Sequence, residues 1–147
     1  MEAHKSRRGA DVRPSSPPDV IEAAHAEMVV KRHLESVAEV RGFIRLVLGA
    51  SGMDDFVPCL VASELVTNAI RHTTGEDDVT FRLGHNEDGS LWMEVQDSHW
   101  EEPRVQRADL DGESGRGLFV VEQYTRYWGV RPLSGNTGKV VFAVLNP

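Results

Sequence analysis

The stretch "SELVTNAIRHT" places an acid, an amide and an imidazole at four-residue intervals, at Glu64, Asn68 and His72. An amide oxygen suits magnesium, which keeps several waters and takes its other ligands from phosphates and one or two protein oxygens. Asn68 fits that role, and Glu64 is suited to accept a proton from a hydroxyl or a water aligned on a γ-phosphate. The alternative is a solvated hydrogen-bonding pair, and this stretch alone does not decide between the two.

Two other places in the sequence offer chemistry. Asp97 stands where the strand-like pattern "LWMEVQD" runs out, and there its carboxylate could accept a hydrogen bond from an amino group such as that of adenine. In "SGRGLFVV", Gly115 and Gly117 allow backbone amides to approach a ligand, a helix start favours phosphate, and Arg116 adds charge. The alternatives are a turn-forming aspartate and a glycine pair that makes an ordinary turn.

The element that must hold Glu64 and Asn68 is a helix. Asp54 and Asp55 predict its start, and the apolar spacing carries it to about His72. Because a helix turns by about 100° per residue, residues four apart step by only about 40° around it. Glu64, Asn68 and His72 therefore form a strip along one border of the apolar face, where the wall of a cleft would lie.

The neighbouring elements follow from the same kind of pattern. Ser36 and Glu39 have the spacing of a capping box, and a helix with apolar residues at helical spacing follows them. A short run at 28–33 favours a strand, and "VTFRL" with "LWMEVQD" predicts a hairpin ending at Asp97. After an irregular connection over 98–114, the patterns predict a helix from the glycines and two final strands.

This order of elements predicts an α+β fold. We expect a two-layer sandwich in which about three helices cover one face of a mostly antiparallel mixed sheet. Residues 1–20 are basic and rich in Pro and Ser and predict a disordered tail, so the domain is expected to span 21–147. The single cysteine, Cys59, lies among apolar residues and is expected to be a small core residue.

Composition excludes several functional classes. The 147 residues are 40% hydrophobic and 27% charged, which is typical of a globular domain. A net charge of -7 opposes a nucleic-acid partner. The sequence has no apolar run of the roughly 18 residues that span a bilayer and no signal-peptide pattern, so we expect a cytoplasmic protein with no membrane partner.

Taken in order, the candidate motifs resemble those of the GHKL (Bergerat-fold) ATP-binding domains. The resemblance is narrower to the anti-sigma-factor serine/threonine kinases among the histidine-kinase-like ATPases, and it runs from about Met28 to Leu145. "ELVTNAIRH" is similar to the N box of the family, "VQD" to the start of its adenine-binding G1 box, and "GRGL" to its G2 box. "RYWGVRP" and "GKVVFAVL" resemble its closing strands.

The resemblance implies ATP and Mg²⁺ as cofactors and assigns a role to each candidate residue. Glu64 would be the general base, Asn68 the magnesium ligand and Asp97 the residue that recognises adenine. The family pattern also assigns positions near the ribose and the phosphates to Arg71, His72 and the amides of Gly115, Arg116, Gly117 and Leu118. The chain departs from the pattern after Asp97, where the family commonly has glycines and this sequence has "SHWEEP", and at Val140, where a threonine is common.

Two functions remain open at this point. In the first, the protein holds MgATP, sequesters a sigma factor and phosphorylates a serine of an antagonist protein. In the second, a degenerate GHKL module binds a nucleotide or a protein partner without phosphotransfer. The resemblance leaves a homodimer open as well. A histidine kinase is disfavoured, because no helical hairpin that could carry a phosphoacceptor histidine precedes the first predicted helix.

Overall fold

The structure, a computed structural model, describes residues 25–50, 52–72, 77–98 and 113–146, which form three α-helices and one five-stranded sheet. The predicted tail, most of the predicted connection after Asp97, and Gly75 lie outside the described residues. The helices are α2 (Ser36–Gly49), α3 (Phe56–His72) and α4 (Glu113–Tyr124). The strands are β1 (His25–Val30), β2 (Val79–His85), β3 (Leu91–Asp97), β4 (Thr125–Pro132) and β5 (Lys139–Leu145).

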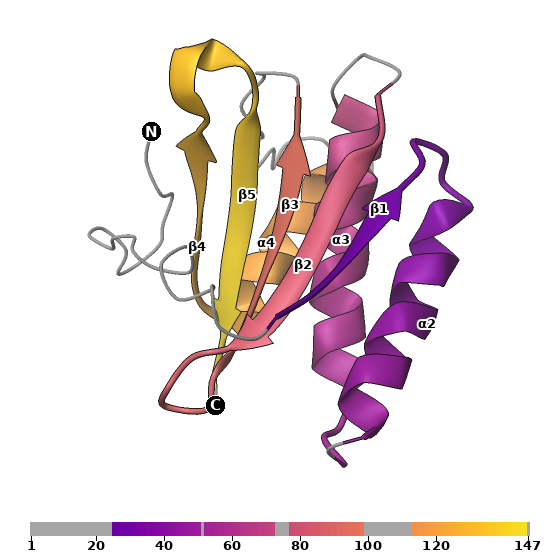
Figure 1. Ribbon diagram of the computed structural model, residues 1–147, viewed down its shortest axis with the longest axis vertical. Coiled ribbons are helices and arrows are strands. Elements are labelled where there is room, and N and C mark those ends of the chain that lie inside the picture. The colour runs from indigo at the N-terminus through magenta and orange to yellow at the C-terminus, as the bar shows by residue number, and fades with distance from the viewer. Residues whose placement is uncertain (1–24, 51, 73–76, 99–112, 147) are drawn as a thin grey trace.

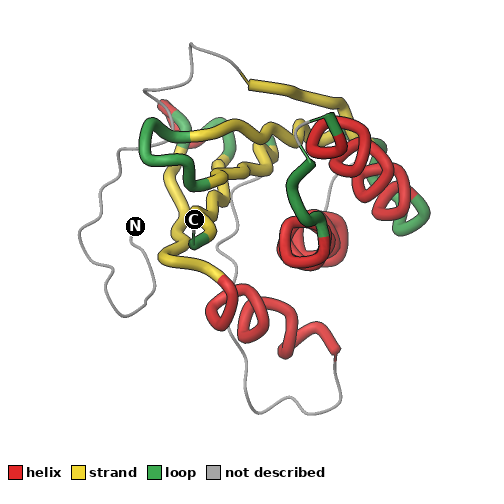
Figure 2. The backbone as a smooth tube through the Cα atoms, turned by 90° about the horizontal axis from the view of Figure 1, so that it is seen from below, coloured by secondary structure: helices red, strands yellow, loops and turns green. Residues whose placement is uncertain are grey.

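The helices all cover one face of the sheet. The strand order is β1-β2-β3-β5-β4, and each of the four pairings between described strands is antiparallel. In Figure 1 α3 and α4 lie behind the sheet and α2 stands beside α3 at the edge next to β1, and the view from below in Figure 2 shows the helices on one side of the sheet. The predicted α+β sandwich is confirmed. None of the described helices is long and apolar enough to cross a membrane.

The core lies between these two layers. Helix α2 buries Val40, Ile44 and Leu48 at helical spacing, and the sheet contributes large side chains such as Phe81 and Trp128. Helix α3 buries its predicted apolar face, with Val61, Ala62, Leu65, Val66 and Ala69 at most 6% exposed. Cys59 is also 6% exposed. This burial confirms the prediction of a small core residue, and it also raises the pKa of the thiol.

Two local predictions were wrong. Helix α2 begins at Ser36 itself, its N-cap is Glu35, and no side chain caps it. A preceding turn takes over this task, because the N–H groups of Ser36 and Val37 donate to the carbonyls of His33 and Leu34 at 2.9 and 3.1 Å. The first strand runs over His25–Val30 rather than 28–33, since β1 extends along β2 as far as Gly84.

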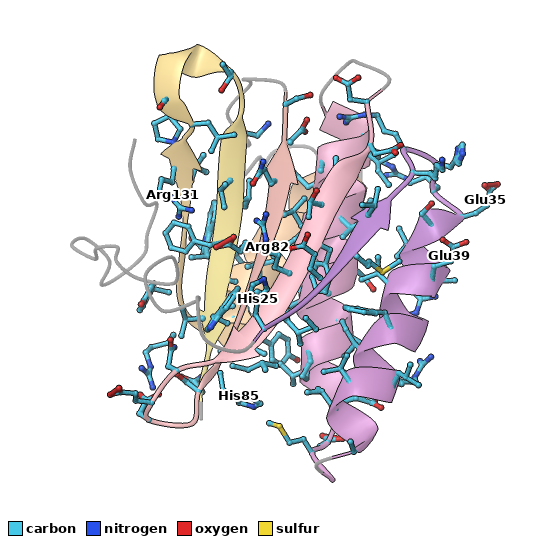
Figure 3. All side chains as sticks on the ribbon, in the orientation of Figure 1. His25, Glu35, Glu39, Arg82, His85 and Arg131 are labelled. Atoms are coloured by element: carbon cyan, nitrogen blue, oxygen red, sulfur yellow. The ribbon has the colours of Figure 1, made fainter. Side chains whose placement is uncertain are left out.

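The sheet face turned away from the helices carries a charged ladder. Arg82 alternates with the core residues Phe81 and Leu83, and Figure 3 shows it with Arg131 on the face nearer the viewer. Arg82 contacts Glu27 at 3.0 Å and the buried Glu94 at 3.3 Å, and Arg131 approaches Glu94 at 3.9 Å. These ion pairs join neighbouring strands across the face of the sheet that the helices do not cover.

Acidification is expected to destabilise the fold through Asp88, in the turn between β2 and β3. This carboxylate accepts hydrogen bonds from the Ser90 N–H at 2.9 Å and hydroxyl at 2.6 Å, and contacts Arg126 at 3.2 Å. These interactions lower its pKa from 3.8 to about 2. The stabilisation is therefore present above about pH 4 and is lost as the pH falls towards about 2.

The measurement compares the thermal midpoint of Asp88→Asn with that of the wild type across this acidic range. Other carboxylates titrate in both proteins, so the informative quantity is the difference between the two midpoints. That difference should shrink as the pH falls through the window. A difference that stays constant from about pH 5 to about pH 2 would contradict the assignment to Asp88.

Candidate functional site

Helix α3 presents Glu64 and Asn68 one turn apart. Both residues are half-buried and lie between the buried face of the helix and the exposed Arg71. Residues four apart on a helix are neighbours, so the carboxylate and the amide share one strip of the surface. The helix ends at His72, whose side chain lies outside what the structure describes.

Asp97 ends β3 with its carboxylate directed towards the helix layer, since it has the same strand parity as the core residues Met93 and Val95. Its side chain is 1% exposed and contacts two cations. Arg32 Nη2 donates to Oδ1 at 2.9 Å, and Lys139 Nζ lies 3.7 Å from Oδ2. Lys139 stands directly opposite Asp97 on β5 and is 2% exposed, so the group is deeply buried.

Arg32 connects this carboxylate to helix α3. Its Nη1 donates to the carbonyl of Ala69 at 2.9 Å, and its Nε donates to the carbonyl of Asp77 at 3.1 Å. Ala69 follows Asn68 directly in the sequence, and Asp77 leads into β2. One guanidinium group therefore ties the end of β3 to the helix turn that carries Asn68.

Helix α4 lies beside α3 but begins earlier than the glycine pair predicted. It starts at Glu113, two residues before Gly115, and packs against α3 and β4. A helix leaves free the N–H groups of its first turn, which here includes Gly115 but not Gly117 or Leu118. The side chain of Arg116 lies outside the described residues, so its predicted role stays a prediction.

A magnesium ion at Asn68 would take few ligands from the protein. Within residues 25–50, 52–72, 77–98 and 113–146, no three His, Cys, Asp or Glu side chains gather as metal ligands do. A magnesium ion that keeps several waters and binds phosphate oxygens needs only one or two protein oxygens, and the amide oxygen of the half-buried Asn68 is a suitable one.

The sequence from residue 30 to residue 144 matches the family model of the histidine kinase-like ATPase domain. The chain belongs to this family. No curated protein matches the sequence significantly. A similar solved structure is described as the crystal structure of the RsbU and RsbW domains of Rv1364c from Mycobacterium tuberculosis. It is 17% identical with a TM-score of 0.63, over 84% of this chain and 32% of that one, so this chain spans about a third of that protein.

The residues of this histidine kinase-like ATPase domain fit a magnesium nucleotide. Asn68 and Glu64 are half-buried on α3, within reach of a ligand at the border of the helix. Asp97, at the end of β3, faces the same helix layer and is joined to α3 by Arg32. A carboxylate oxygen accepts hydrogen bonds, and an adenine amino group is a donor of the matching kind.

Sequence patterns missed Arg32 and Lys139. They lie 65 and 42 positions from Asp97, and no spacing rule joins residues so far apart. One feature of the sequence could have indicated Lys139, because it begins a strand and Asp97 ends the strand that pairs with it. The register between the two strands cannot be determined from the sequence, so this pairing could not be predicted. In this ATPase domain the Asp97 carboxylate also balances the charges of Arg32 and Lys139. A substitution of Asp97 therefore affects stability as well as any contact with a ligand.

Proposed function

We propose that this histidine kinase-like ATPase domain binds MgATP and acts as an anti-sigma factor that phosphorylates a serine of an antagonist protein. The observation that carries the proposal is the link between helix α3 and Asp97. Asn68 and Glu64 lie one turn apart on that helix, and Arg32 bonds both to the carbonyl next to Asn68 and to Asp97. Asn68, which is suited to the magnesium and the phosphates, is thus connected through Arg32 to Asp97, which is suited to adenine.

In this proposal each residue has a separate task. Asp97 binds the adenine amino group, Asn68 holds the magnesium ion with its amide oxygen, and Glu64 accepts the proton of the serine hydroxyl. The serine oxygen bonds to the γ-phosphorus as the bond from that phosphorus to the bridging oxygen breaks, and ADP leaves. Bound MgATP supplies the phosphoryl group and charge neutralisation, while the protein supplies position and the proton acceptor.

The resemblance to the anti-sigma-factor kinases supports a sigma factor and an antagonist protein as partners. The similar solved chain contains an RsbW domain together with an RsbU domain. Because the identity is 17%, that likeness supports the fold, and the partners remain part of the proposal. A cytoplasmic location belongs to the same proposal.

A second candidate function is a binding module that transfers no phosphate. The observation in its favour is the burial of Asp97, which is 1% exposed and already contacts Arg32 and Lys139. A carboxylate in ion pairs with two buried cations is needed to balance their charge, so Asp97 has a structural role even if no nucleotide contacts it. The two candidates differ in whether nucleotide binds and in whether the γ-phosphate leaves.

Titration of the purified protein with ATP and with ADP, in the presence and absence of magnesium, tests the first candidate. The wild type is expected to bind both nucleotides, more tightly with magnesium. Asn68→Ala should weaken the magnesium-dependent binding by about tenfold or more, the cost of losing one contact of about 1.5 kcal/mol to a charged group. Binding without magnesium should change much less.

The control is Thr67→Ala, at the adjacent position of the same helix. It is expected to leave the magnesium dependence unchanged, because successive helix residues point about 100° apart. Asp97→Ala is a poor control, since removing one member of a buried ion pair typically costs about 3–5 kcal/mol of stability. Absence of binding at millimolar ATP in the wild type would remove the ATP proposal and leave a protein-binding module.

A further inference from the structure

We propose that Arg32 is a positioning residue that fixes Asp97 against helix α3 and thereby sets the preference of the site for adenine over guanine. This inference rests on the proposed function, because it requires that Asp97 contact the base. Arg32 lies in the connection between β1 and α2, outside every sequence motif that suggested nucleotide binding.

The contacts of Arg32 leave its guanidinium group one orientation. Three of its nitrogen atoms donate to three different segments, namely to the Asp97 carboxylate and to the carbonyls of Ala69 and Asp77, at 2.9 to 3.1 Å. The side chain is 7% exposed. Because guanidinium is planar and its donors form a rigid fork, holding two backbone carbonyls also fixes the direction from which Asp97 is bonded.

Lys139 acts on the same carboxylate in a different way. Its ammonium group is a compact point charge, and it lies 3.7 Å from Oδ2, beyond the distance of a short hydrogen bond. It neutralises the carboxylate without selecting a rotation of the carboxylate plane. The orientation of Asp97 therefore depends on Arg32 rather than on Lys139.

Orientation decides which base the carboxylate accepts. Adenine carries an amino group, a donor, where guanine carries a carbonyl oxygen, an acceptor. A carboxylate held in a fixed plane bonds the donor and repels the acceptor, and a site built to bond a donor rejects strongly an analogue that lacks it. If the carboxylate can rotate, the bond to adenine weakens and the penalty for guanine relaxes.

The experiment measures the affinities of ADP and GDP without magnesium for the wild type and for Arg32→Lys, with circular dichroism and thermal midpoints recorded in parallel. Lysine keeps the charge but loses the fork. The ratio of the ADP and GDP affinities is expected to fall by about tenfold in Arg32→Lys, because one charged hydrogen bond is misdirected. If Arg32→Lys does not fold, Arg32→Gln, which keeps a planar donor, is measured in its place.

The matched control is Arg82→Lys on the opposite face of the sheet. Arg82 also bonds a buried carboxylate, that of Glu94 at 3.3 Å, but it lies on the sheet face turned away from α3. Arg82→Lys is expected to lower the thermal midpoint and to leave the ratio of the ADP and GDP affinities unchanged. Equal changes of that ratio in both variants would mean that the effect is general destabilisation, and would overturn the inference.

A double variant tests whether Arg32 acts through Asp97. In Asp97→Asn the preference for ADP should already be reduced, and adding Arg32→Lys should reduce it no further. A preference that is unchanged in Arg32→Lys, or that falls independently of Asp97, overturns the role of Arg32 and leaves the proposed function standing. A wild type that binds neither nucleotide overturns the proposed function and this inference together.

Discussion

Replacing Gly138 by alanine is expected to lower the free energy of unfolding by about 3 kcal/mol or more. Gly138 has a φ of 151°, in a region that L side chains rarely adopt. An added Cβ would lie 2.2 Å from the carbonyl oxygen of Asp97 and 2.8 Å from the Cα of Ser98. Both are backbone atoms, so no side-chain rotation relieves the contact.

The backbone around Gly138 cannot easily move away from Asp97. The Gly138 carbonyl accepts a hydrogen bond from the Leu133 N–H at 2.8 Å, which closes the connection between β4 and β5. The next residue, Lys139, pairs with Asp97 across the sheet. The chain must therefore shift the end of β3 or open this turn, and either change also displaces the candidate adenine contact.

Gly42→Ala is the matched control for this substitution. Gly42 lies within α2, and an added Cβ there meets no atom within 4 Å. Alanine is favoured over glycine inside a helix, so stability should rise by about 0.5–1 kcal/mol. Urea unfolding of the two variants and the wild type gives both values. The packing of Gly138 against Asp97 would be contradicted if Gly138→Ala were as stable as the wild type.

The sequence predicted those parts of the fold that depend on local periodicity. The alternation of Leu91, Met93 and Val95 located β3 and its end at Asp97, because the two faces of a strand differ in environment. The helical spacing of Val61, Leu65 and Ala69 located the buried face of α3 in the same way. For both elements, residues a few positions apart determine the environment.

The parts that could not be predicted are the hydrogen-bond and ion-pair partners of particular polar groups. The sequence pattern treated Ser36 as a helix cap, but the turn formed by His33 and Leu34 supplies the acceptors, and the side chain of Ser36 is buried. The alternatives for Asp97, a ligand contact or a turn, both omitted the ion pairs with Arg32 and Lys139 that its burial requires. The partners of Asp97 follow from strand register and helix docking, which local patterns do not contain.

Glu64→Gln is expected to slow phosphotransfer by about 10²–10⁴-fold and to leave nucleotide binding almost unchanged. The substitution preserves the size of this half-buried side chain and removes its ability to accept a proton. Loss of a general base typically costs about 10²–10⁴-fold in rate. The measurement is the formation of phosphoserine on candidate antagonist proteins, with ADP and ATP affinities determined on the same samples.

A partner-free assay extends this test, because a base that activates a serine hydroxyl also acts on water. Slow release of phosphate from ATP by the wild type should therefore fall in Glu64→Gln by a similar factor. Glu39→Gln is the control for the charge change, since Glu39 is an exposed acid on α2, as Figure 3 shows, and should leave both rates unchanged.

The outcomes of these assays separate the two candidate functions through Glu64. A kinase requires that Glu64→Gln keep the affinity for ATP and lose the rate, since the base acts in the transition state rather than on the bound ground state. Phosphotransfer that stays near the wild-type rate in Glu64→Gln would remove Glu64 as the base. If the wild type binds ATP, forms no phosphoserine and releases no phosphate, then Glu64 has no catalytic task, and the chain is a nucleotide-binding module whose buried Asp97 serves binding alone.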